Sequence, residues 1–520
     1  MAAQKRTLQI GDLDVEFTGI SIDSRTTQPG NLFIGLKGKH LNGNQFALDA
    51  LTKGASAAVI DDPAFVCNSE ALSPLSHPSE PELRAGDTSG RSTAYLTARE
   101  YSSTGSKHQK ASSEDLLYKA ILVEDSLEIL KGIGLRIKDL VNPKTIIGIT
   151  GSVGKTTTKL WLNRVLNEYS LTFASDNNYN TIYGVPICFS MLSDGTEYCI
   201  LEFGSSSKGE ISTLSKYAGP NIGIITNVFE SHIGNFDDKF ELAVEKISII
   251  DGMPEGGTLI YHGDSEFAGA IKAAALARNL IPISVGYSKG SDVYIKSGPP
   301  IELHAAKKTF RYEIGCHGIH YEYISACVVG VLIALDLDPS SALPLFRELK
   351  PLQGRGEVID CTCRGKHLTI IDGSYNASPT SMLASIDVLS SYEGAKIAII
   401  GQMKGLGSHE AEYHYTIVQE LSNHRDIRQV YFVGERKLWG IFVHHHPAIK
   451  CFASLDEAAI LEIIDLLPND VTILLKGSNS IGLSKFIEYI RSHIHTPAIQ
   501  QPSTWLPNSM SKKKLAEGGL

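Results

Sequence analysis

A glycine-rich run in the first third of the chain has the residue types and spacing that bind a chain of phosphates. It reads Gly148-Ile-Thr-Gly-Ser-Val-Gly-Lys-Thr-Thr157, follows a strand-like apolar stretch at 145–149 and precedes a helix-like stretch at 158–166. Backbone amides at the start of a helix point at an anion. The lysine supplies a point charge for the β and γ phosphates, and the next threonine hydroxyl can bind Mg²⁺. The sequence therefore predicts a nucleoside triphosphate site made by Gly151, Ser152, Val153, Gly154, Lys155, Thr156 and Thr157.

Two more residues with suitable chemistry follow strand-like stretches. Glu202 ends the apolar stretch at 198–202, and His232 comes shortly after the stretch at 222–226. In an open parallel sheet, ligands bind beyond the carboxyl ends of the strands, so site residues belong at such positions. Taken singly, Glu202 is better explained as a surface carboxylate at a strand end, and His232 as a loop histidine. Together with the phosphate loop, in this order along the chain, they are more persuasive as site residues.

The elements that must position these residues form an α/β pattern. Short apolar strands alternate with helical stretches from 145 to about 350, which predicts a central parallel sheet of the phosphate-loop ATPase type. Further apolar strands at 368–371, 397–400, 430–433 and 473–475 predict a C-terminal Rossmann-like unit. We therefore expect three domains, a small mixed α/β domain at 1–140, a central domain at 141–350 and a C-terminal domain at 351–492, followed by a flexible tail at 493–520.

Composition narrows the class of protein. The chain has 520 residues and a formal net charge of -9, which argues against a dedicated nucleic-acid binder. No apolar run approaches the ~18 residues of a membrane span, and the eight cysteines form no CxxC pair. Residues 63–114 are rich in Ser, Pro, Thr and Glu without periodicity, which predicts a disordered insertion. We expect a cytoplasmic monomer with reduced thiols, without membrane insertion.

Several motifs together resemble those of the Mur ligase family. The loop form Gly-x-Thr-Gly-x-x-Gly-Lys-Thr-Thr is shared by Mur ligases and folylpolyglutamate synthases. Ser21-Ile-Asp-Ser-Arg25 with Pro29-Gly-Asn-Leu-Phe33 looks like the N-terminal domain that holds the UDP of the substrate, which folylpolyglutamate synthases lack. Asp372-Gly-Ser-Tyr-Asn-Ala-Ser-Pro379 is similar to the signature of the members that add the terminal dipeptide. The resemblance implies an ATP-dependent, ADP-forming ligase that joins a UDP-linked muramoyl tripeptide to D-alanyl-D-alanine through an acyl phosphate, in peptidoglycan precursor synthesis.

The resemblance also assigns roles to individual residues. It implies that Lys246 is carbamylated by CO₂ and helps to hold a second Mg²⁺, although a solvated helix lysine is equally consistent with the sequence. The residues that it implies are Lys155, His232, Arg355 and Lys246 for catalysis; Thr156, Glu202, His232 and Lys246 for metal; Tyr375 and Asn376, with the loop, for ATP; and Ser24, Arg25, Asn178 and Asn180 for the substrate.

The chain departs from the family pattern at a few positions around the expected nucleotide and acceptor sites. Gly318, Tyr321 and Thr181 stand where asparagines are usual, and Gln402 and Gly405 stand where acidic residues are usual. Two alternatives therefore stay open. One is a Mur-like amide ligase that acts on a different carboxylic acid, and the other is a catalytically silent homologue that binds nucleotide.

Overall fold

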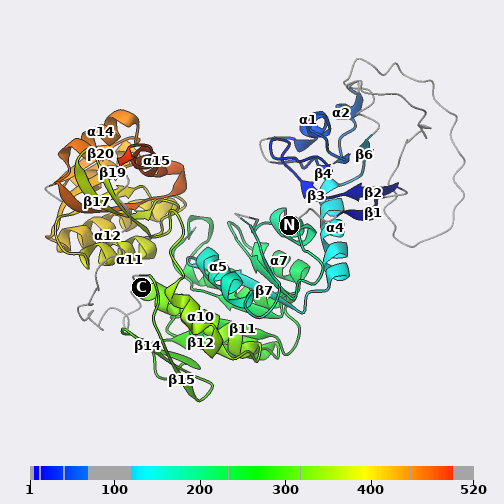
Figure 1. Cartoon of the computed structure of the whole chain (residues 1–520), viewed down its shortest axis with the longest axis horizontal. Helices are drawn as coiled ribbons and strands as arrows, with labels where there is room; N and C mark the ends of the chain where they lie inside the picture. The colour runs from blue at the N-terminus through cyan, green and yellow to red at the C-terminus, as the bar shows by residue number, and fades with distance from the viewer. Residues whose placement is uncertain are drawn as a thin grey trace, which may run out of the picture. The chain divides into compact units, whose positions relative to one another are not determined.

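A computed structural model describes residues 5–10, 13–38, 41–67, 119–176, 179–231, 233–316, 318–444 and 448–495. These residues form two compact units, the first from Met1–Lys144 with Ser175–Glu197 and the second from Thr145–Ala174 with Tyr198–Leu520. Asn178, His232, most of the predicted insertion and nearly all of the predicted tail lie outside the described residues. Figure 1 shows the elements in the order of the chain.

The first unit is built on a four-stranded parallel sheet in the order β3-β4-β5-β6. Its helix α4 begins after Asp125, whose carboxylate accepts hydrogen bonds from two amides of the first turn. Helix α6 packs against α4, which brings the segment 175–197 into this unit. The elements are β1 (Arg6–Ile10), β2 (Leu13–Phe17), β3 (Gly19–Ser21), β4 (Asn31–Ile34), η1 (Gly43–Phe46), α1 (Ala47–Thr52), β5 (Ala57–Ile60), α2 (Ala64–Cys67), β6 (Ala120–Leu122), α4 (Ser126–Val141) and α6 (Gly184–Ser190).

The second unit begins with a nine-stranded sheet in the order β15-β14-β13-β12-β11-β10-β7-β9-β8. All pairs from β8 to β13 are parallel, and the pairs β13–β14 and β14–β15 are antiparallel. The elements are β7 (Thr145–Thr150), α5 (Lys155–Leu166), β8 (Thr172–Ala174), β9 (Tyr198–Glu202), α7 (Glu210–Ala218), β10 (Ile222–Ile225), η2 (Ile233–Asn235), α8 (Lys239–Ile247), η3 (Ser248–Gly252), β11 (Thr258–His262), α9 (Ala268–Ala277), β12 (Ile281–Gly286), β13 (Val293–Lys296), β14 (Ile301–Ala305), β15 (Lys308–Tyr312), α10 (Ile319–Ala334), η4 (Pro339–Ser341) and η5 (Leu343–Arg347).

Strand β7 is the point where the strand order of this sheet reverses, with β9 and β8 on one side and β10 and β11 on the other. Its neighbours are β9 on one side and β10 on the other, so the chain crosses β7 between these two strands. The loops that follow the three strands therefore meet at one edge, which is where open α/β sheets bind ligands.

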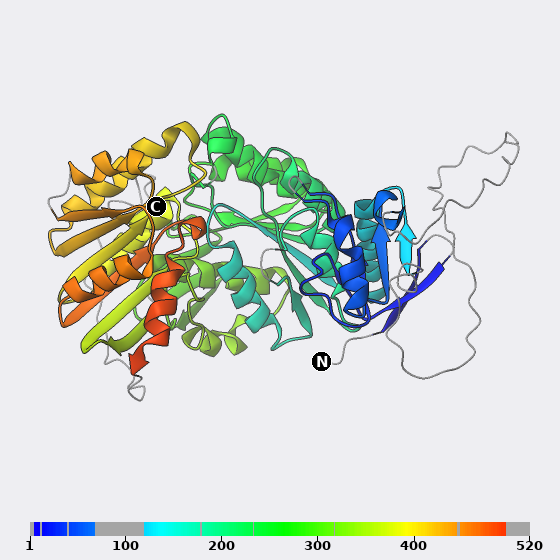
Figure 2. The ribbon, with the colours of Figure 1, turned by 90° about the horizontal axis from the view of Figure 1, so that it is seen from above.

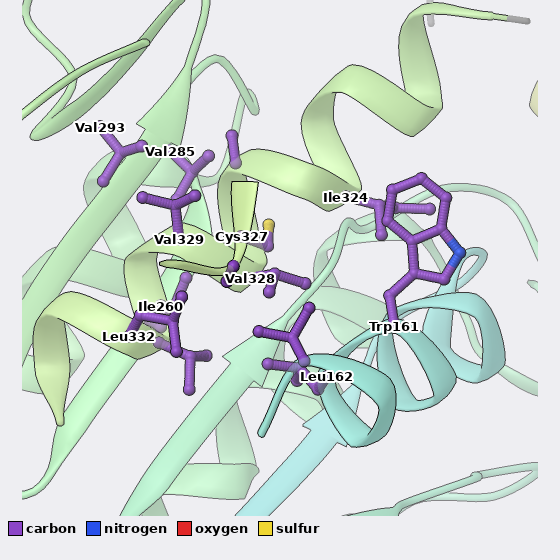
Figure 3. Packing of buried hydrophobic residues seen from close by; sticks show 14 of the residues in the cluster. Trp161, Leu162, Ile260, Val285, Val293, Ile324, Cys327, Val328, Val329 and Leu332 are labelled. Atoms are coloured by element: carbon purple, nitrogen blue, oxygen red, sulfur yellow. The ribbon is translucent and has the colours of Figure 1, made fainter. Parts of the chain in front are cut away.

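Helix α10 holds the helix that follows β7. All of its residues from Tyr323 to Leu332 are buried, on every side of the helix, as expected for a segment enclosed by protein. Trp161 and Leu162 of α5 pack in the same cluster as Ile324 and Val328 of α10 (Figure 3). This packing fixes the helix whose first turn faces the expected phosphate site.

The rest of the second unit is a seven-stranded sheet in the order β20-β19-β18-β21-β17-β16-β22, parallel from β20 to β17. Side chains alternate between its faces, Ile397 and Ile399 in one core and Ala398 and Ile400 in the other, and helices lie on both sides (Figure 2). The elements are β16 (Glu357–Cys363), β17 (Lys366–Gly373), α11 (Pro379–Ser390), β18 (Lys396–Gly401), η6 (Gly407–His409), α12 (Glu410–Asn423), β19 (Ile427–Val433), α13 (Arg436–Val443), β20 (Ile449–Phe452), α14 (Glu457–Leu466), β21 (Asp470–Lys476), η7 (Asn479–Ile481), α15 (Ser484–Ser492) and β22 (Ile494–His495).

The predicted fold class is confirmed. A small mixed α/β domain, a mostly parallel central sheet and a doubly wound C-terminal sheet occur in the predicted order. In the part of the chain that the structure describes, no helix has the length and apolar character needed to span a bilayer. The seven cysteines whose side chains are described form no disulfide.

Candidate active site

The phosphate loop lies between the buried strand β7 and the first turn of α5. Gly151 has φ +137°, and a Cβ added there would lie 2.0 Å from the Thr226 Oγ1 atom, so no other residue fits without a shift. Gly154, also at positive φ, is the residue before the helix. Amides of a first helical turn have no partner within the helix, and these are the donors that we assign to phosphate oxygens.

Residues after β10 hold the first half of the loop. The Asn227 side-chain oxygen accepts hydrogen bonds from the amides of Ser152, at 3.1 Å, and Val153, at 2.9 Å. The Ser152 hydroxyl donates to the Phe229 carbonyl at 2.6 Å and accepts from the Phe229 amide at 2.8 Å. Because the amides of Ser152 and Val153 already have partners, these two residues shape the loop in this structure.

Lys155 folds back over the loop. Its Nζ atom donates to the carbonyls of Gly151 at 2.6 Å and Ser152 at 3.2 Å. Burial lowers the pKa of Lys155; the Glu202 carboxylate opposes this shift and the Arg355 cation adds to it. Lys155 therefore lies within electrostatic range of groups from both sheets of the second unit.

Thr156 and Glu202 offer a pair of oxygen ligands. The Thr156 hydroxyl donates to the Glu202 carboxylate at 2.9 Å, and Glu202 is 5% exposed at the end of β9. Lys159, 1% exposed, forms an ion pair with the same carboxylate at 3.6 Å. Hydroxyl and carboxylate oxygens are the ligands that Mg²⁺ prefers, so this donor set fits the ion. Sequence reasoning missed Lys159, although its spacing of three residues from Thr156 on a helix was a usable signal.

Lys246 is a buried amine on α8. It is 4% exposed, and its Nζ atom donates to the Ser205 hydroxyl at 2.8 Å. Burial lowers the pKa of Lys246 to about 7, the Lys155 cation adds to the shift, and Glu245 and Glu210 oppose it. A solvated helix lysine, the alternative left open by the sequence, does not describe this buried residue. With its pKa at about 7, a large share of the amine is neutral at neutral pH, and the neutral form can act as a nucleophile.

The second sheet contributes Arg355, which lies between two glycines just before β16. Its guanidinium stacks over the Tyr375 ring, 4.1 Å from the ring centroid. The buried Asp372 carboxylate accepts hydrogen bonds from the Gly354 amide at 3.0 Å and from the Ser374 hydroxyl at 2.6 Å. Asp372 thus joins the Arg355 segment to the segment that carries Tyr375, a role that sequence reasoning did not assign.

Lys476 adds a further cation at the end of β21. Its Nζ atom donates to the Asn376 carbonyl at 2.9 Å. Burial lowers the pKa of Lys476 to about 8, with Arg355 adding to the shift and Asp372 opposing it. Three of these interactions lower a pKa: Lys155 lowers that of Lys246, and Arg355 lowers those of Lys155 and Lys476. Cations held this close repel one another, and a bound polyanion such as a triphosphate relieves that repulsion.

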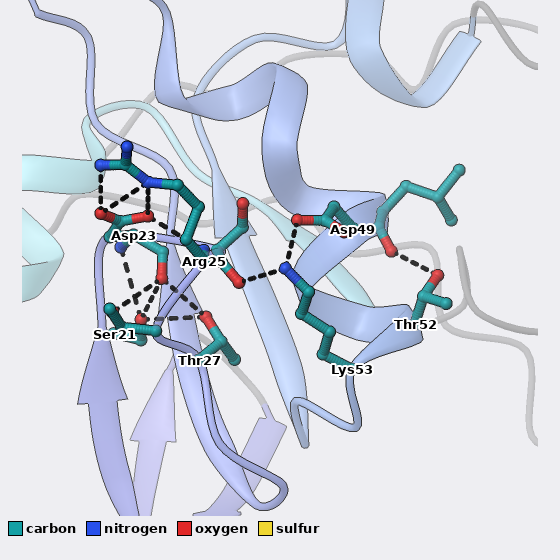
Figure 4. Close-up of polar contacts among 10 residues, drawn as sticks. Ser21, Asp23, Arg25, Thr27, Asp49, Thr52 and Lys53 are labelled. Atoms are coloured by element: carbon teal, nitrogen blue, oxygen red, sulfur yellow. Dashed lines mark hydrogen bonds and ion pairs between the residues drawn. The ribbon is translucent and has the colours of Figure 1, made fainter.

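The substrate residues implied by the resemblance lie in the first unit. Arg25 is largely exposed, and its guanidinium donates three hydrogen bonds to the Asp23 carboxylate, at 2.9, 3.2 and 2.7 Å (Figure 4). Ser24 is buried, and its carbonyl accepts from Lys53 at 2.8 Å. A hydrogen bond from Ser24 lowers the pKa of Asp49. Asn180 is partly buried, and Asn178 lies outside the described residues.

Three departures from the family pattern have clear structural roles. Gly318, at φ +120°, is the residue before α10. Tyr321 is 3% exposed, and its hydroxyl donates to the Arg355 carbonyl at 2.9 Å. Thr181 accepts a hydrogen bond from the Gly184 amide at the start of α6, at 3.3 Å.

Gln402 and Gly405, which stand where the family pattern has acidic residues, each make hydrogen bonds in this structure. Gln402 is fully buried; its amide donates to the Glu410 carboxylate at 2.6 Å, and its side-chain oxygen accepts from the Glu435 amide at 3.1 Å. The Gly405 carbonyl accepts from the Gly234 amide at 3.1 Å. The family pattern has a carboxylate at position 402. In this chain the Glu410 carboxylate lies next to that position, hydrogen-bonded to Gln402.

Family models match three stretches of the chain. Residues 16–90 match "Mur ligase family, catalytic domain", residues 149–327 match "Mur ligase middle domain" and residues 354–479 match "Mur ligase, glutamate ligase domain". Two relatives are named UDP-N-acetylmuramoyl-tripeptide--D-alanyl-D-alanine ligase. The Buchnera aphidicola protein is 26% identical over 92% of this chain and 94% of its own length, and the Bacillus subtilis protein is 29% identical over 76% of each.

Solved structures show the same architecture. MurF from Acinetobacter baumannii matches with a TM-score of 0.73 and 22% identity, over 92% of this chain and 95% of that chain. MurF from Thermotoga maritima in complex with ADP matches with a TM-score of 0.69 and 22% identity, over 91% and 97%. The three family models together cover well over half of the chain and include the phosphate loop and the Arg355 segment. The chain belongs to the Mur ligase family.

Proposed function

We propose that the protein is an ATP-dependent ligase that joins D-alanyl-D-alanine to UDP-N-acetylmuramoyl-tripeptide and releases ADP and phosphate. The observation that carries the proposal is that Tyr321, which stacks on Trp161 of the phosphate-loop helix, donates its hydroxyl to the Arg355 carbonyl and so ties the Arg355 segment to that helix. Arg355 also lowers the pKa of Lys155. Two sheets thereby supply cations to one anion site, as transfer of a terminal phosphoryl group requires. The names of the relatives at 26% and 29% identity support the choice of substrates.

The first step forms the acyl phosphate. A carboxylate oxygen of the tripeptide attacks the γ-phosphorus of ATP, the bond to the bridging oxygen breaks, and ADP leaves. The first-turn amides of α5 hold the phosphates, while Lys155 and Arg355 stabilise the charge that spreads over the transferring group. The Tyr375 ring stacks against the guanidinium, which limits the movement of the Arg355 side chain during the transfer.

The second step forms the amide bond. The amine of the dipeptide attacks the acyl carbon, the bond from this carbon to the phosphate oxygen breaks, and phosphate and the amine proton leave. The phosphate carries away the charge that Lys155, Arg355 and Lys476 neutralised, so these cations serve both steps. Because the intermediate reacts with water, the two sheets must exclude water while it exists.

We further propose that Thr156 and Glu202 bind Mg²⁺ and that Lys246 becomes a carbamate. Bound Mg²⁺ would neutralise phosphate oxygens during the transfer. The neutral amine of Lys246 would attack CO₂ and lose one proton, and the resulting carbamate would offer an oxygen of the kind that Mg²⁺ prefers. Its contact with the Ser205 hydroxyl would orient the new group. His232, which lies outside the described residues, is proposed as a further ligand by resemblance.

Phosphate release from the purified protein tests the proposed reaction. With ATP and Mg²⁺ present, we expect release only when UDP-N-acetylmuramoyl-tripeptide and D-alanyl-D-alanine are both added, with one amide product formed per phosphate. Mass spectrometry of the product identifies the bond. Release that needs neither substrate, or no release with both, would contradict the proposal.

A second candidate uses the same chemistry on a different acid. The observation that favours it is Gln402, an amide that is hydrogen-bonded to Glu410 where the family pattern has an acidic side chain. Such a change alters the hydrogen-bonding groups offered at the end of β18, and polar groups of this kind decide discrimination between substrates. A panel of other acids and amines in the same assay separates the two candidates.

The setting of the reaction is also a proposal. We expect a monomer that acts in the cytoplasm, where ATP is available and the described cysteines stay reduced. Size-exclusion chromatography with light scattering at a low protein concentration checks the oligomeric state.

A further inference from the structure

Arg355 is held at its backbone as well as at its side chain. Gly354, at φ +74°, would place an added Cβ 2.9 Å from the Cβ of Tyr375. Gly356, at φ +101°, would place one 2.8 Å from the Tyr321 hydroxyl oxygen. The two glycines therefore allow two tyrosines to approach Arg355 from different segments, Tyr375 against the guanidinium and Tyr321 against the backbone.

The Tyr321 hydroxyl makes one well-formed hydrogen bond. It donates to the Arg355 carbonyl at 2.9 Å, and the residue is 3% exposed. Burial raises the pKa of Tyr321, so its hydroxyl keeps the proton that it donates. The hydrogen bond is partly buried. If the Arg355 carbonyl lost this donor it would have to shift to find another partner, because an acceptor left unpaired away from water is costly.

The ring of Tyr321 is anchored to the phosphate-loop helix. It stacks on the Trp161 ring of α5 with centroids 5.8 Å apart and an angle of 15° between the planes. Trp161 is itself 2% exposed and packs in the core that joins α5 to α10. One residue thus connects the helix that begins at Lys155 with the segment that carries Arg355.

We propose that Tyr321 is a positioning residue whose hydroxyl fixes the Arg355 backbone and so places the guanidinium beside the terminal phosphate of the bound nucleotide. This inference rests on the proposed role of Arg355 at the phosphate site. It assigns a function to a position where the chain departs from the usual family pattern, and it does not depend on the identity of the acid or the amine.

Nucleotide binding to the full-length protein tests the inference without turnover. Isothermal titration calorimetry in Mg²⁺ compares ADP with the β,γ-imido analogue of ATP, which differ in the terminal phosphate. For Tyr321→Phe, which keeps the ring, we expect the Kd of the triphosphate analogue to rise about tenfold, while the Kd of ADP changes by less than about twofold. In an Arg355→Ala background the same substitution should add no further loss, because its effect passes through the arginine.

The matched control is Tyr323→Phe. Tyr323 is buried in the same helix, and its ring packs on His262 with centroids 4.4 Å apart. We expect it to leave both Kd values unchanged. If Tyr321→Phe does not fold, Gly356→Ala disturbs the same contact from the other side and should give the same preferential loss of the triphosphate analogue.

Three results would overturn the inference: equal weakening of both nucleotides, no change in either, or an additional loss in the Arg355→Ala background. A protein that binds nucleotides as expected but releases no phosphate with the proposed substrates would contradict the proposed function alone. The two failures are therefore distinguishable.

Discussion

At the scale of single residues, the reaction depends on charges held at defined positions. Lys155 donates hydrogen bonds to the loop carbonyls. Its charge lowers the pKa of Lys246, and the Glu202 carboxylate in turn raises the pKa of Lys155. A buried lysine cation near other cations is unfavourable on its own. A bound polyanion stabilises that charge and offsets the cost of both desolvation and repulsion. This arrangement makes Lys155 the residue whose loss should cost most.

Lys155→Ala is expected to lower kcat by about 10² to 10³, as removal of one group that stabilises transition-state charge usually does. Lys272→Ala is the matched control, since Lys272 is exposed on α9. Steady-state phosphate release with saturating substrates gives the ratio. A loss of less than about threefold would contradict a role in the transfer, and circular dichroism checks that the variant is folded.

Lys246 predicts a pH dependence with a defined sign. Its pKa is lowered to about 7, so the amine is protonated below that value and neutral above it. Only the neutral amine takes up CO₂. After removal of CO₂, recovery of activity on addition of bicarbonate should therefore increase as the pH rises through about 7, at fixed dissolved CO₂. The measurement is the recovered initial rate between pH 6 and 8.5.

The control for this prediction removes the nucleophile. Lys246→Ala should lose activity at every pH, respond to no bicarbonate, and recover part of its rate with added acetate, which supplies the missing carboxylate oxygen. A wild-type rate that is independent of dissolved CO₂ throughout the range would count against carbamate formation.

At the scale of elements, the loop after β7 depends on close packing with the loop after β10. Gly151→Ala places a methyl group 2.0 Å from the Thr226 Oγ1 atom at a backbone φ of +137°. Overpacking of this kind costs about 1–3 kcal/mol, in addition to the backbone strain. We expect a clear fall in the Tm of the second unit and loss of nucleotide binding, measured by differential scanning calorimetry and by calorimetric titration.

Gly256→Ala separates strain from contact. Gly256 has φ +76° and nothing within 4 Å of an added Cβ, so its substitution carries the left-handed backbone cost of about 1–2 kcal/mol alone. Nucleotide binding should be unchanged in this variant. Equal effects of the two substitutions on Tm and on binding would show that the contact with Thr226 is not what constrains the loop.

At the scale of the whole molecule, the segment between β5 and β6 tests how much of the chain the fold needs. The two strands pair in parallel, with Ala58 opposite Ala120 and Ile60 opposite Leu122. Parallel neighbours need a crossover connection of about a dozen residues or more. Replacement of residues 68–118 by about 15 Gly and Ser residues should keep β6 in place and leave Tm and turnover unchanged.

Direct fusion of residue 67 to residue 119 is the contrasting variant. It leaves too few residues for the crossover, so we expect loss of β6 pairing and a lower Tm of the first unit. If the 15-residue replacement also lost activity while its Tm stayed normal, the segment 68–118 would have a function beyond connecting the two strands.

The sequence by itself determined the features that lie in contiguous residues. The phosphate loop is readable because its geometry depends on glycines, a lysine and a helix start within ten residues. The alternation of apolar strands and helical stretches predicted the α/β class and the order of the sheets, because side-chain periodicity is a local property. The roles of His232 and Asn178 stay predictions, since both lie outside the described residues.

The tertiary structure alone decided which distant residues act together. Lys155, Lys246, Arg355 and Lys476 come from four separate parts of the chain, and their effects on one another's pKa arise only when the folded second unit brings those parts together. Lys159 and Tyr321 were not assigned roles because their partners, Glu202 and the Arg355 carbonyl, are far away in sequence. The charge of a buried amine and the strength of a buried hydrogen bond depend on the surrounding protein, and a list of residue types does not contain those surroundings.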